Sequence, residues 1–285
     1  MYKVGIICDL NYSRHFLFKS YFYSVKNLYG TPMLVKSTKD LQGIELLFIA
    51  DDHYEVNKLI WQQEGFIEYC NTNDIEVVVL TNEKILNSYF PWNIDNLIRL
   101  NEIKNLYHYT IDVDDCILLG LKLNRCPMSR TVRDQIVVDI NNKKDKIVFI
   151  GTTKCGKDSY QNRVLCLEKL QKMIDIDIVD PSDVRWNNYF QTIAGYRFVL
   201  SPISNGNFFP MRFYEALSVK SIPIHQVKKN TLSYYNIESK FDDCIFFEEP
   251  EEVKDKLESF TLKTSHNKLY MEDTLGMMLK KDGLL

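Results

Sequence analysis

The sequence predicts an α/β protein built from two Rossmann-like domains, each a parallel sheet with helices on both faces. Short, uniformly apolar runs rich in β-branched residues recur along the chain, which is typical of strands buried on both faces. Segments of helical or irregular pattern separate these runs, as expected for βαβ units. A polar and charged segment at residues 124–144 divides the 285 residues into halves of similar size, and each half is long enough for a domain of its own.

The N-terminal half supplies the first domain, which we expect to span residues 1–135. Four apolar runs in it are predicted as strands: Val4–Ile7, Leu46–Ile49, Val77–Leu80 and Ile117–Leu119. Residues 124–144 are predicted to form an interdomain linker with one further strand or helix.

The second domain is expected to span residues 136–265 and repeats the alternation of strands and helices. Its predicted strands are Lys146–Ile150, Ile174–Val179, Arg197–Ser201, Ser221–His225 and a run that begins at Cys244. Its predicted helices are Asn162–Met173, Pro210–Val219 and a third that opens at Pro250, where acidic residues suit a helix N-terminus. Residues 266–285 are expected to form a C-terminal helix that can pack back on the first domain.

Composition and charge exclude several classes of protein. The formal charge of −3, with both signs interspersed, gives no basic field for nucleic acid. The seven cysteines are scattered without a C-x-x-C pair, so we expect neither disulfides nor a zinc site. The N-terminal stretch lacks a signal-peptide pattern, and no apolar run is long enough to cross a bilayer. We therefore expect a cytoplasmic protein without a transmembrane segment, as a monomer or weak dimer.

The loop after Lys146–Ile150 reads GTTKCGKD from Gly151 to Asp158, close to the phosphate-binding pattern G-x-x-x-x-G-K-[ST]. A P-loop needs a hydroxyl after its lysine to bind magnesium, and an aspartate stands there. A P-loop phosphotransferase and a polar loop without a ligand both remain alternatives. We favour backbone N–H groups facing a diphosphate, with Lys154, Lys157 or Arg163 neutralising its charge.

The segment from Ala194 to Gln226 carries the most information about function. In it a strand leads into a loop of glycine and asparagine, and then into a helix that opens with Arg212 and Glu215. Arginine binds a diphosphate with paired donors, glutamate accepts hydrogen bonds from hydroxyl groups, and a glycine loop lets the backbone approach a ligand. These residue types suit a nucleotide sugar, although Arg212 and Glu215 would also form an ordinary i, i+3 ion pair on a helix surface.

The same segment resembles a known family. Exostosin-like glycosyltransferases with the GT-B fold carry a strand F-V-L-x-P, a glycine-containing loop, and then R-x-x-E-A-L-x-x-x-x-I-P-V. The residues that match are Phe198, Val199, Leu200, Pro202, Gly206, Arg212, Glu215, Ala216, Leu217, Ile222, Pro223 and Ile224. The resemblance covers the second domain from Lys146 onward, and the chain departs from the family pattern at Ile203 and Pro210.

The resemblance implies two Rossmann-like domains that face each other across a cleft, and a UDP-sugar such as UDP-xylose or UDP-glucuronic acid as the donor. Retaining enzymes carry a glutamate eight residues before the helix glutamate, where this chain has Asn207, so transfer with inversion is implied. No metal and no cofactor are expected; the nucleotide sugar is a substrate. The expected donor-binding residues are Lys154, Lys157, Arg163, Ser201, Asn205, Gly206, Arg212 and Glu215.

An inverting transfer also needs a general base near the hydroxyl of the glycan acceptor, and we expect it from the first domain. Asp51, Asp52 and His53 follow the strand Leu46–Ile49, and two adjacent carboxylates beside an imidazole can raise one pKa towards neutrality. Asp9, after the first strand, is the second choice. An aspartate that caps a helix would explain the same residues. A catalytically silent sugar-binding protein therefore also remains an alternative.

Overall fold

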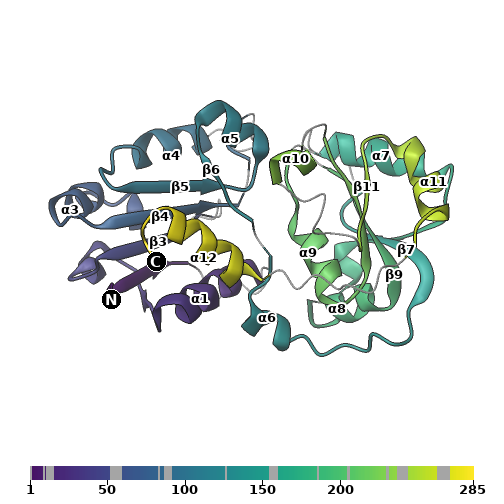
Figure 1. Cartoon of the computed structure of the whole chain (residues 1–285), viewed down its shortest axis with the longest axis horizontal. Helices are drawn as coiled ribbons and strands as arrows, with labels where there is room; N and C mark the ends of the chain where they lie inside the picture. Colours follow the sequence, from purple (N-terminus) through teal and green to yellow (C-terminus); the bar gives the residue numbers. More distant parts are fainter. Residues whose placement is uncertain are drawn as a thin grey trace. The chain divides into compact units, whose positions relative to one another are not determined.

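The computed structural model describes residues 2–8, 10, 16–51, 60–82, 84–86, 92–125, 127–153, 160–184, 186–203, 206–228, 231–235, 243–261 and 270–285 (Figure 1), without the side chains of residues 16, 51, 92, 93, 186, 187 and 235. The chain forms two compact units. Unit 1 consists of Met1–Arg133 and Leu269–Leu285, and unit 2 consists of Asp134–Lys268. Both units are α/β, and the first crossing between them lies inside the segment predicted as a linker.

Unit 1 contains a parallel sheet in the order β2-β1-β3-β4-β5-β6. Its strands are β1 (Val4–Ile7), β2 (Met33–Leu34), β3 (Leu46–Asp51), β4 (Glu76–Thr81), β5 (Leu106–Thr110) and β6 (Lys122–Leu123). Its helices are α1 (Phe16–Tyr29), the 3-10 helix η1 (Thr38–Leu41), α3 (Phe66–Thr72), α4 (Trp92–Leu100), α5 (Val113–Leu119), α6 (Arg130–Asp134, at the crossing) and α12 (Met271–Lys281).

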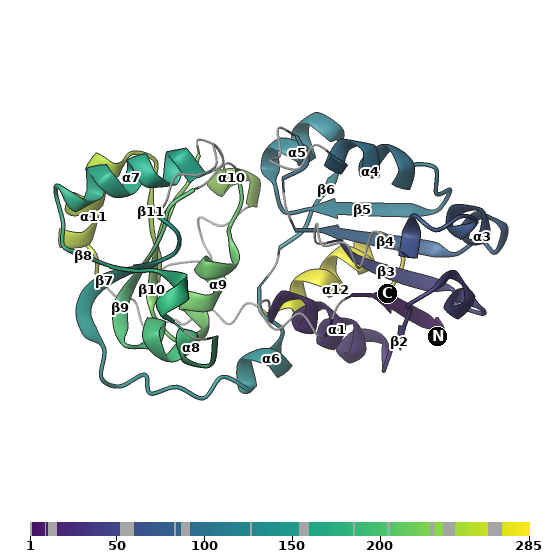
Figure 2. The same cartoon turned by 180° about the vertical axis from the view of Figure 1, so that it is seen from behind.

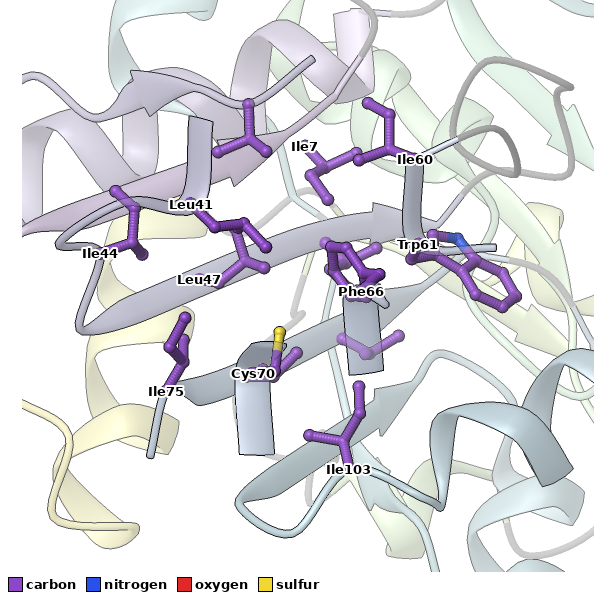
Figure 3. Close-up of a cluster of buried hydrophobic side chains, with 14 of the residues drawn as sticks. Ile7, Leu41, Ile44, Leu47, Ile60, Trp61, Phe66, Cys70, Ile75 and Ile103 are labelled. Carbon is purple, nitrogen blue, oxygen red and sulfur yellow. The ribbon is translucent and has the colours of Figure 1, made fainter. Parts of the chain in front are cut away.

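One face of this sheet packs against α3 and the segments beside it. Ile49 and Val79 lie in the same buried cluster as Trp61, Phe66 and Cys70, all five at 0% exposure (Figure 3). Burial of large apolar side chains is the main stabilising term in a fold of this kind. The apolar runs predicted as β1, β3 and β4 are therefore confirmed as buried strands.

The opposite face of the sheet is covered by α1 and α12, which lie side by side in both views (Figures 1 and 2). The ring of Tyr29 on α1 lies 5.8 Å from that of Phe48 on β3. A Cβ atom added to Gly276 on α12 would lie 3.3 Å from the Leu28 side chain, so the two helices pack closely. The C-terminal residues thus belong to unit 1, although the whole of unit 2 separates them from it in the sequence.

The strand predicted at Ile117–Leu119 is wrong, because these residues form the second half of helix α5. The Asp112 carboxylate caps this helix by accepting hydrogen bonds from the backbone N–H groups of residues 114 and 115. Gly120 ends the helix in the left-handed conformation, with φ of 68°. The apolar run misled the prediction because Ile117 and Leu118 lie on the exposed side of the helix, at 61% and 70% exposure.

Unit 2 contains a second parallel sheet, in the order β11-β10-β9-β7-β8. Its strands are β7 (Lys144–Ile150), β8 (Ile176–Val179), β9 (Tyr196–Ser201), β10 (Ile222–Gln226) and β11 (Ile245–Phe247). Its helices are α7 (Gln161–Gln171), η3 (Pro181–Asp183), α8 (Trp186–Ala194), α9 (Met211–Ser218), α10 (Thr231–Tyr235), η4 (Pro250–Glu252) and α11 (Val253–Glu258).

Two core layers hold the helices of unit 2 on the sheet. Helices α7 and α11 cover one face, where Phe149 and Phe247 pack with Leu170 and Val253. Helices α8 and α9 contact β9 on the other face. Lys143 precedes β7, and its ammonium group donates to the backbone oxygen atoms of the last residue of α8 and the C-cap of α9, at 2.8 and 3.0 Å. A cation at two helix C-termini is favourable.

The two sheets share one strand order. In each unit the second strand lies on one side of the first, and the third strand lies on the other side. The direction of winding therefore reverses between β1 and β3 in unit 1, and between β7 and β9 in unit 2. Ligands of doubly wound sheets bind beyond the carboxyl ends of the strands at such a reversal. The predicted site residues Asp9, Asp51 and Ser201 follow or end these strands.

Candidate functional site

The best-defined candidate site lies at the carboxyl end of β7 and is built around the first turn of α9. Pro210, in extended conformation, precedes this helix. The Phe213 ring packs against the rings of Phe209, His225 and Phe246, at centroid distances of 4.7, 5.4 and 6.0 Å. These aromatic contacts fix the orientation of α9 on the sheet, and with it the starting point of the Arg212 side chain.

The Arg212 guanidinium lies against the end of β7. Its Cζ atom is 4.9 Å from the centroid of the buried Phe149 ring, a cation–π geometry. Its Nη2 atom lies 3.0 Å from the position that a Cβ atom on Gly151 would occupy. The Nε atom of Arg212 is buried and has no hydrogen-bond partner in the described structure. An arginine held by a ring, with an unused donor, is suited to binding an anionic oxygen.

Gly151 makes this arrangement possible, because a side chain there would displace its neighbours. The Cβ atom of an alanine would lie 2.6 Å from Cζ of Phe149 as well as close to Arg212. We expect Gly151→Ala to lower the free energy of unfolding by about 1–3 kcal/mol and to weaken pyrophosphate binding. Urea unfolding and calorimetric titration measure both effects.

Gly195→Ala is the matched control for this substitution. The nearest atom to an added Cβ is the Thr192 carbonyl oxygen at 3.4 Å, an ordinary contact. Equal losses in the two variants would show that the neighbours of Gly151 shift freely and that the glycine is not required there.

Glu215 is buried at 6% exposure, one turn after Arg212. Its Oε2 atom accepts a hydrogen bond of 2.7 Å from the Tyr189 hydroxyl on α8. Burial raises the pKa of Glu215, while the Tyr189 hydrogen bond and the charge of Arg212 oppose the rise. No direct ion pair joins Arg212 and Glu215, both of which the structure describes, so the simple i, i+3 pair considered from the sequence does not form.

The described residues between β9 and α9 make hydrogen bonds within unit 2. The Ser201 carbonyl oxygen accepts a hydrogen bond of 2.7 Å from Nδ1 of His225, whose pKa burial lowers to about 4. The amide oxygen of Asn207 accepts a hydrogen bond from the Thr231 hydroxyl. Gly206, which precedes Asn207, is also buried. Ser201 is at 0% exposure, and its hydroxyl lies 3.3 Å from the same Nδ1 atom of His225.

The other predicted donor-binding residues are placed only in part. Arg163 lies in the first turn of α7, with Cζ 4.7 Å from the Tyr160 ring. The described contacts join neither Arg163 nor Ser201 to Arg212. Lys154, Lys157 and Asn205 lie outside the described residues.

In the sequence, the predicted catalytic residues follow or end the two strands at the reversal point of the other sheet. Asp52 and Asp9 are outside the described residues, and Asp51 is described only by its backbone, which pairs with Thr81 at the end of β3. Ile7 pairs with Ile49, so β1 and β3 end next to each other. The topology thus brings the ends of the strands that precede Asp9 and Asp52 together.

A buried polar cluster in unit 1 was not predicted from the sequence. Asn124 donates a hydrogen bond of 2.9 Å to the Tyr21 hydroxyl, which in turn donates to Asn82. Asp115, at 0% exposure, accepts from the backbone N–H groups of Ile85 and Leu86 at 2.6 and 2.9 Å. Consecutive acidic residues after an aspartate are a helix-start signal that could have revealed α5. The hydrogen-bond partners of these side chains are far away in the sequence, so no local sequence pattern predicts the contacts.

Asp115 predicts a pH dependence of stability. Burial raises its pKa from 3.8 to about 6, against the two backbone hydrogen bonds. The folded protein therefore binds the proton more tightly than the unfolded chain. The contribution of Asp115 is fully present below pH 3.8 and is lost as the pH rises through about 6. We expect the difference in unfolding free energy between the natural protein and Asp115→Asn to fall over this window, on the order of 3 kcal/mol.

Urea unfolding of both proteins at a series of pH values measures this difference. Taking the difference cancels the titration of groups that do not interact with Asp115; Asp112 and Lys84 do interact with it. A difference that grows with pH would mean that the hydrogen bonds outweigh burial and that the pKa is lowered.

Comparison with known proteins adds no family assignment. No model of a known protein family matches the chain, and no curated protein sequence matches it. Among the helices that the structure describes, none combines the length and apolar character needed to cross a bilayer. Within the same residues, no cluster of three or more His, Cys, Asp and Glu side chains is arranged to hold a metal ion.

Proposed function

We propose that the protein is a glycosyltransferase that moves a sugar from a nucleotide sugar to a hydroxyl group of a glycan. The donor is a UDP-sugar such as UDP-xylose or UDP-glucuronic acid, and the transfer inverts the anomeric centre without a metal ion. Unit 2 binds the donor and unit 1 binds the acceptor, the division of roles that belongs to the GT-B fold. Two Rossmann-like units with the same strand order support this assignment.

The observation that carries the proposal is the position of Arg212. Its guanidinium lies at the carboxyl end of β7, on the Phe149 ring and beside Gly151, and its buried Nε donor has no partner among the described residues. Doubly wound sheets bind nucleotides at this kind of place. The fork of donors on arginine matches two phosphate oxygens. In the proposed reaction Arg212 binds the diphosphate of the donor, with further positive charge from Arg163, Lys154 and Lys157.

The chemistry requires stabilisation of the departing diphosphate and a base for the acceptor. A carboxylate, proposed as Asp52 with Asp51 and Asp9 as alternatives, takes the proton of the acceptor hydroxyl. That oxygen forms a bond to the anomeric carbon on the face opposite the leaving group. The bond from this carbon to the diphosphate oxygen breaks, and UDP leaves with both electrons. Positive charge placed at the leaving oxygen lowers the barrier of such a step.

Ligand-dependent stability tests the proposal against its alternatives. A ligand that binds only the folded state raises the melting temperature. UDP is expected to stabilise the protein equally with and without magnesium. Stabilisation by ATP with magnesium, and none by UDP, would instead favour a phosphotransferase that uses the loop Gly151–Lys157. If sugars alone stabilise the protein, it is a non-catalytic sugar-binding protein and the proposal is wrong.

Activity is then measured by release of UDP from a panel of UDP- and GDP-sugars. Slow hydrolysis of one donor in the absence of an acceptor identifies the sugar, because water replaces the acceptor hydroxyl. The variant Arg212→Gln is the negative control for this assay.

A further inference from the structure

We infer that Tyr189 is a positioning residue that holds the Arg212 guanidinium in place, both directly and through the Glu215 carboxylate. The inference deepens the proposed function and rests on it only for the identity of the ligand. No local sequence pattern points to this residue, since Tyr189 lies on α8 and its partner Glu215 lies on α9, 26 positions later.

The contact joins two helices that pack on the same sheet. The Tyr189 hydroxyl donates a hydrogen bond of 2.7 Å to Oε2 of Glu215. Helices α8 and α9 contact each other, and both contact β9. The Tyr189 ring also packs edge-on against Phe190, which is buried, at a centroid distance of 5.4 Å. The phenol is therefore held by packing as well as by its hydroxyl group.

The charges that act on this contact come from both helices. Among the described residues, the Tyr189 hydroxyl and the Arg212 guanidinium act on the Glu215 carboxylate. Arg212 also acts directly on the Tyr189 hydroxyl, through its positive charge and through a side-chain hydrogen bond. A buried carboxylate stays ionised only if nearby donors and cations compensate for the loss of water. By donating to Glu215, Tyr189 favours the ionised carboxylate, whose charge interacts with that of Arg212.

The result is an arginine fixed before any ligand arrives. The Phe149 ring lies against its guanidinium face, Gly151 leaves room for its Nη2 atom, and Glu215 supplies a counter-charge from the same helix. A side chain that is already ordered loses less conformational entropy when it binds. The Tyr189 hydroxyl thus contributes to affinity without touching the ligand.

Tyr189→Phe tests the inference, because it removes the hydroxyl and keeps the ring. The first readout is the ¹H–¹⁵N signal of the Arg212 Nε–H group in the ligand-free protein, assigned with Arg212→Gln. We expect this signal to shift in Tyr189→Phe and in Glu215→Gln. We also expect hydrogen exchange of this group with water to become about tenfold faster, and the affinity for UDP to fall about tenfold.

Tyr196→Phe is the matched control. Its hydroxyl also donates to a carboxylate in unit 2, that of Asp177 at 2.8 Å. This control is expected to leave the Arg212 signal and the affinity for UDP unchanged. An Arg212 signal that stays the same in both Tyr189→Phe and Glu215→Gln overturns the inference. If the signal shifts while the natural protein binds no UDP, the positioning role stands and the proposed function fails.

Discussion

Replacing Arg212 with glutamine is expected to weaken the binding of UDP by about 100-fold, because hydrogen bonds between an arginine and a phosphate are strengthened by charge and are formed in pairs. Glutamine keeps a polar side chain of moderate length but has neither the charge nor the fork of donors. Isothermal titration calorimetry at moderate salt measures the dissociation constant. Arg212→Lys, which retains the charge alone, is expected to give an intermediate loss.

Arg197→Gln provides the matched control. This arginine lies on β9 of the same unit, with Cζ 5.1 Å from the Phe198 ring, and it pairs with Asp145 at 2.9 Å. It is 41% exposed and lies outside the candidate site, so its ion pair contributes little to stability. UDP should bind this variant as it binds the natural protein. Unchanged UDP affinity in Arg212→Gln would remove Arg212 from the site and, with it, the main support for the proposed function.

The strands of both units were predictable because burial on both faces leaves a strong local signal. The runs that became β1, β3 and β4 are apolar at nearly every position, and those that became β7, β9 and β10 each contain a short apolar core, IVFI, FVL and IPI. Strand β5 was missed because its sequence, LYHYT, interleaves tyrosines with a histidine. Tyr109 there is buried by a contact with Asp282, far away in the sequence. Such a contact cannot be recognised from local periodicity.

In the candidate site too, local sequence predicts some residues, whereas others depend on contacts with distant parts of the chain. Arg212 and Gly151 could be singled out because each follows a predicted strand and matches a residue type that binds phosphate. Tyr189 and Asp115 could not, since their importance comes from partners on other elements. Glu215 illustrates both cases: the sequence marked it as a ligand-binding residue, whereas the structure buries it and gives one of its oxygens to Tyr189. Sequence patterns locate strand ends well, but they do not show which polar side chains form hydrogen bonds within the protein.

Unit 1 should depend on its C-terminal helix, and Leu279→Ala is expected to lower its free energy of unfolding by about 2–5 kcal/mol. Leu275 and Leu279 on α12 are buried, at 1% and 0% exposure. The Glu272 carboxylate on the same helix accepts hydrogen bonds from the Asn27 side chain and the Arg130 backbone, at 2.8 and 3.0 Å. Truncating Leu279 leaves a cavity in the layer between α12 and the sheet, and closely packed helices fill such a cavity only in part.

The effect should be confined to one unit, which makes the prediction specific. Hydrogen exchange followed by mass spectrometry is expected to show faster exchange in the β3 peptide of unit 1 and unchanged exchange in the β9 peptide of unit 2. Met277→Ala is the control, because Met277 lies on the same helix at 57% exposure. A truncation there removes little buried surface and should change stability by less than about 0.5 kcal/mol. If Leu279→Ala exposes both peptides equally, the two units unfold together, and the C-terminal helix stabilises more than the unit it packs on.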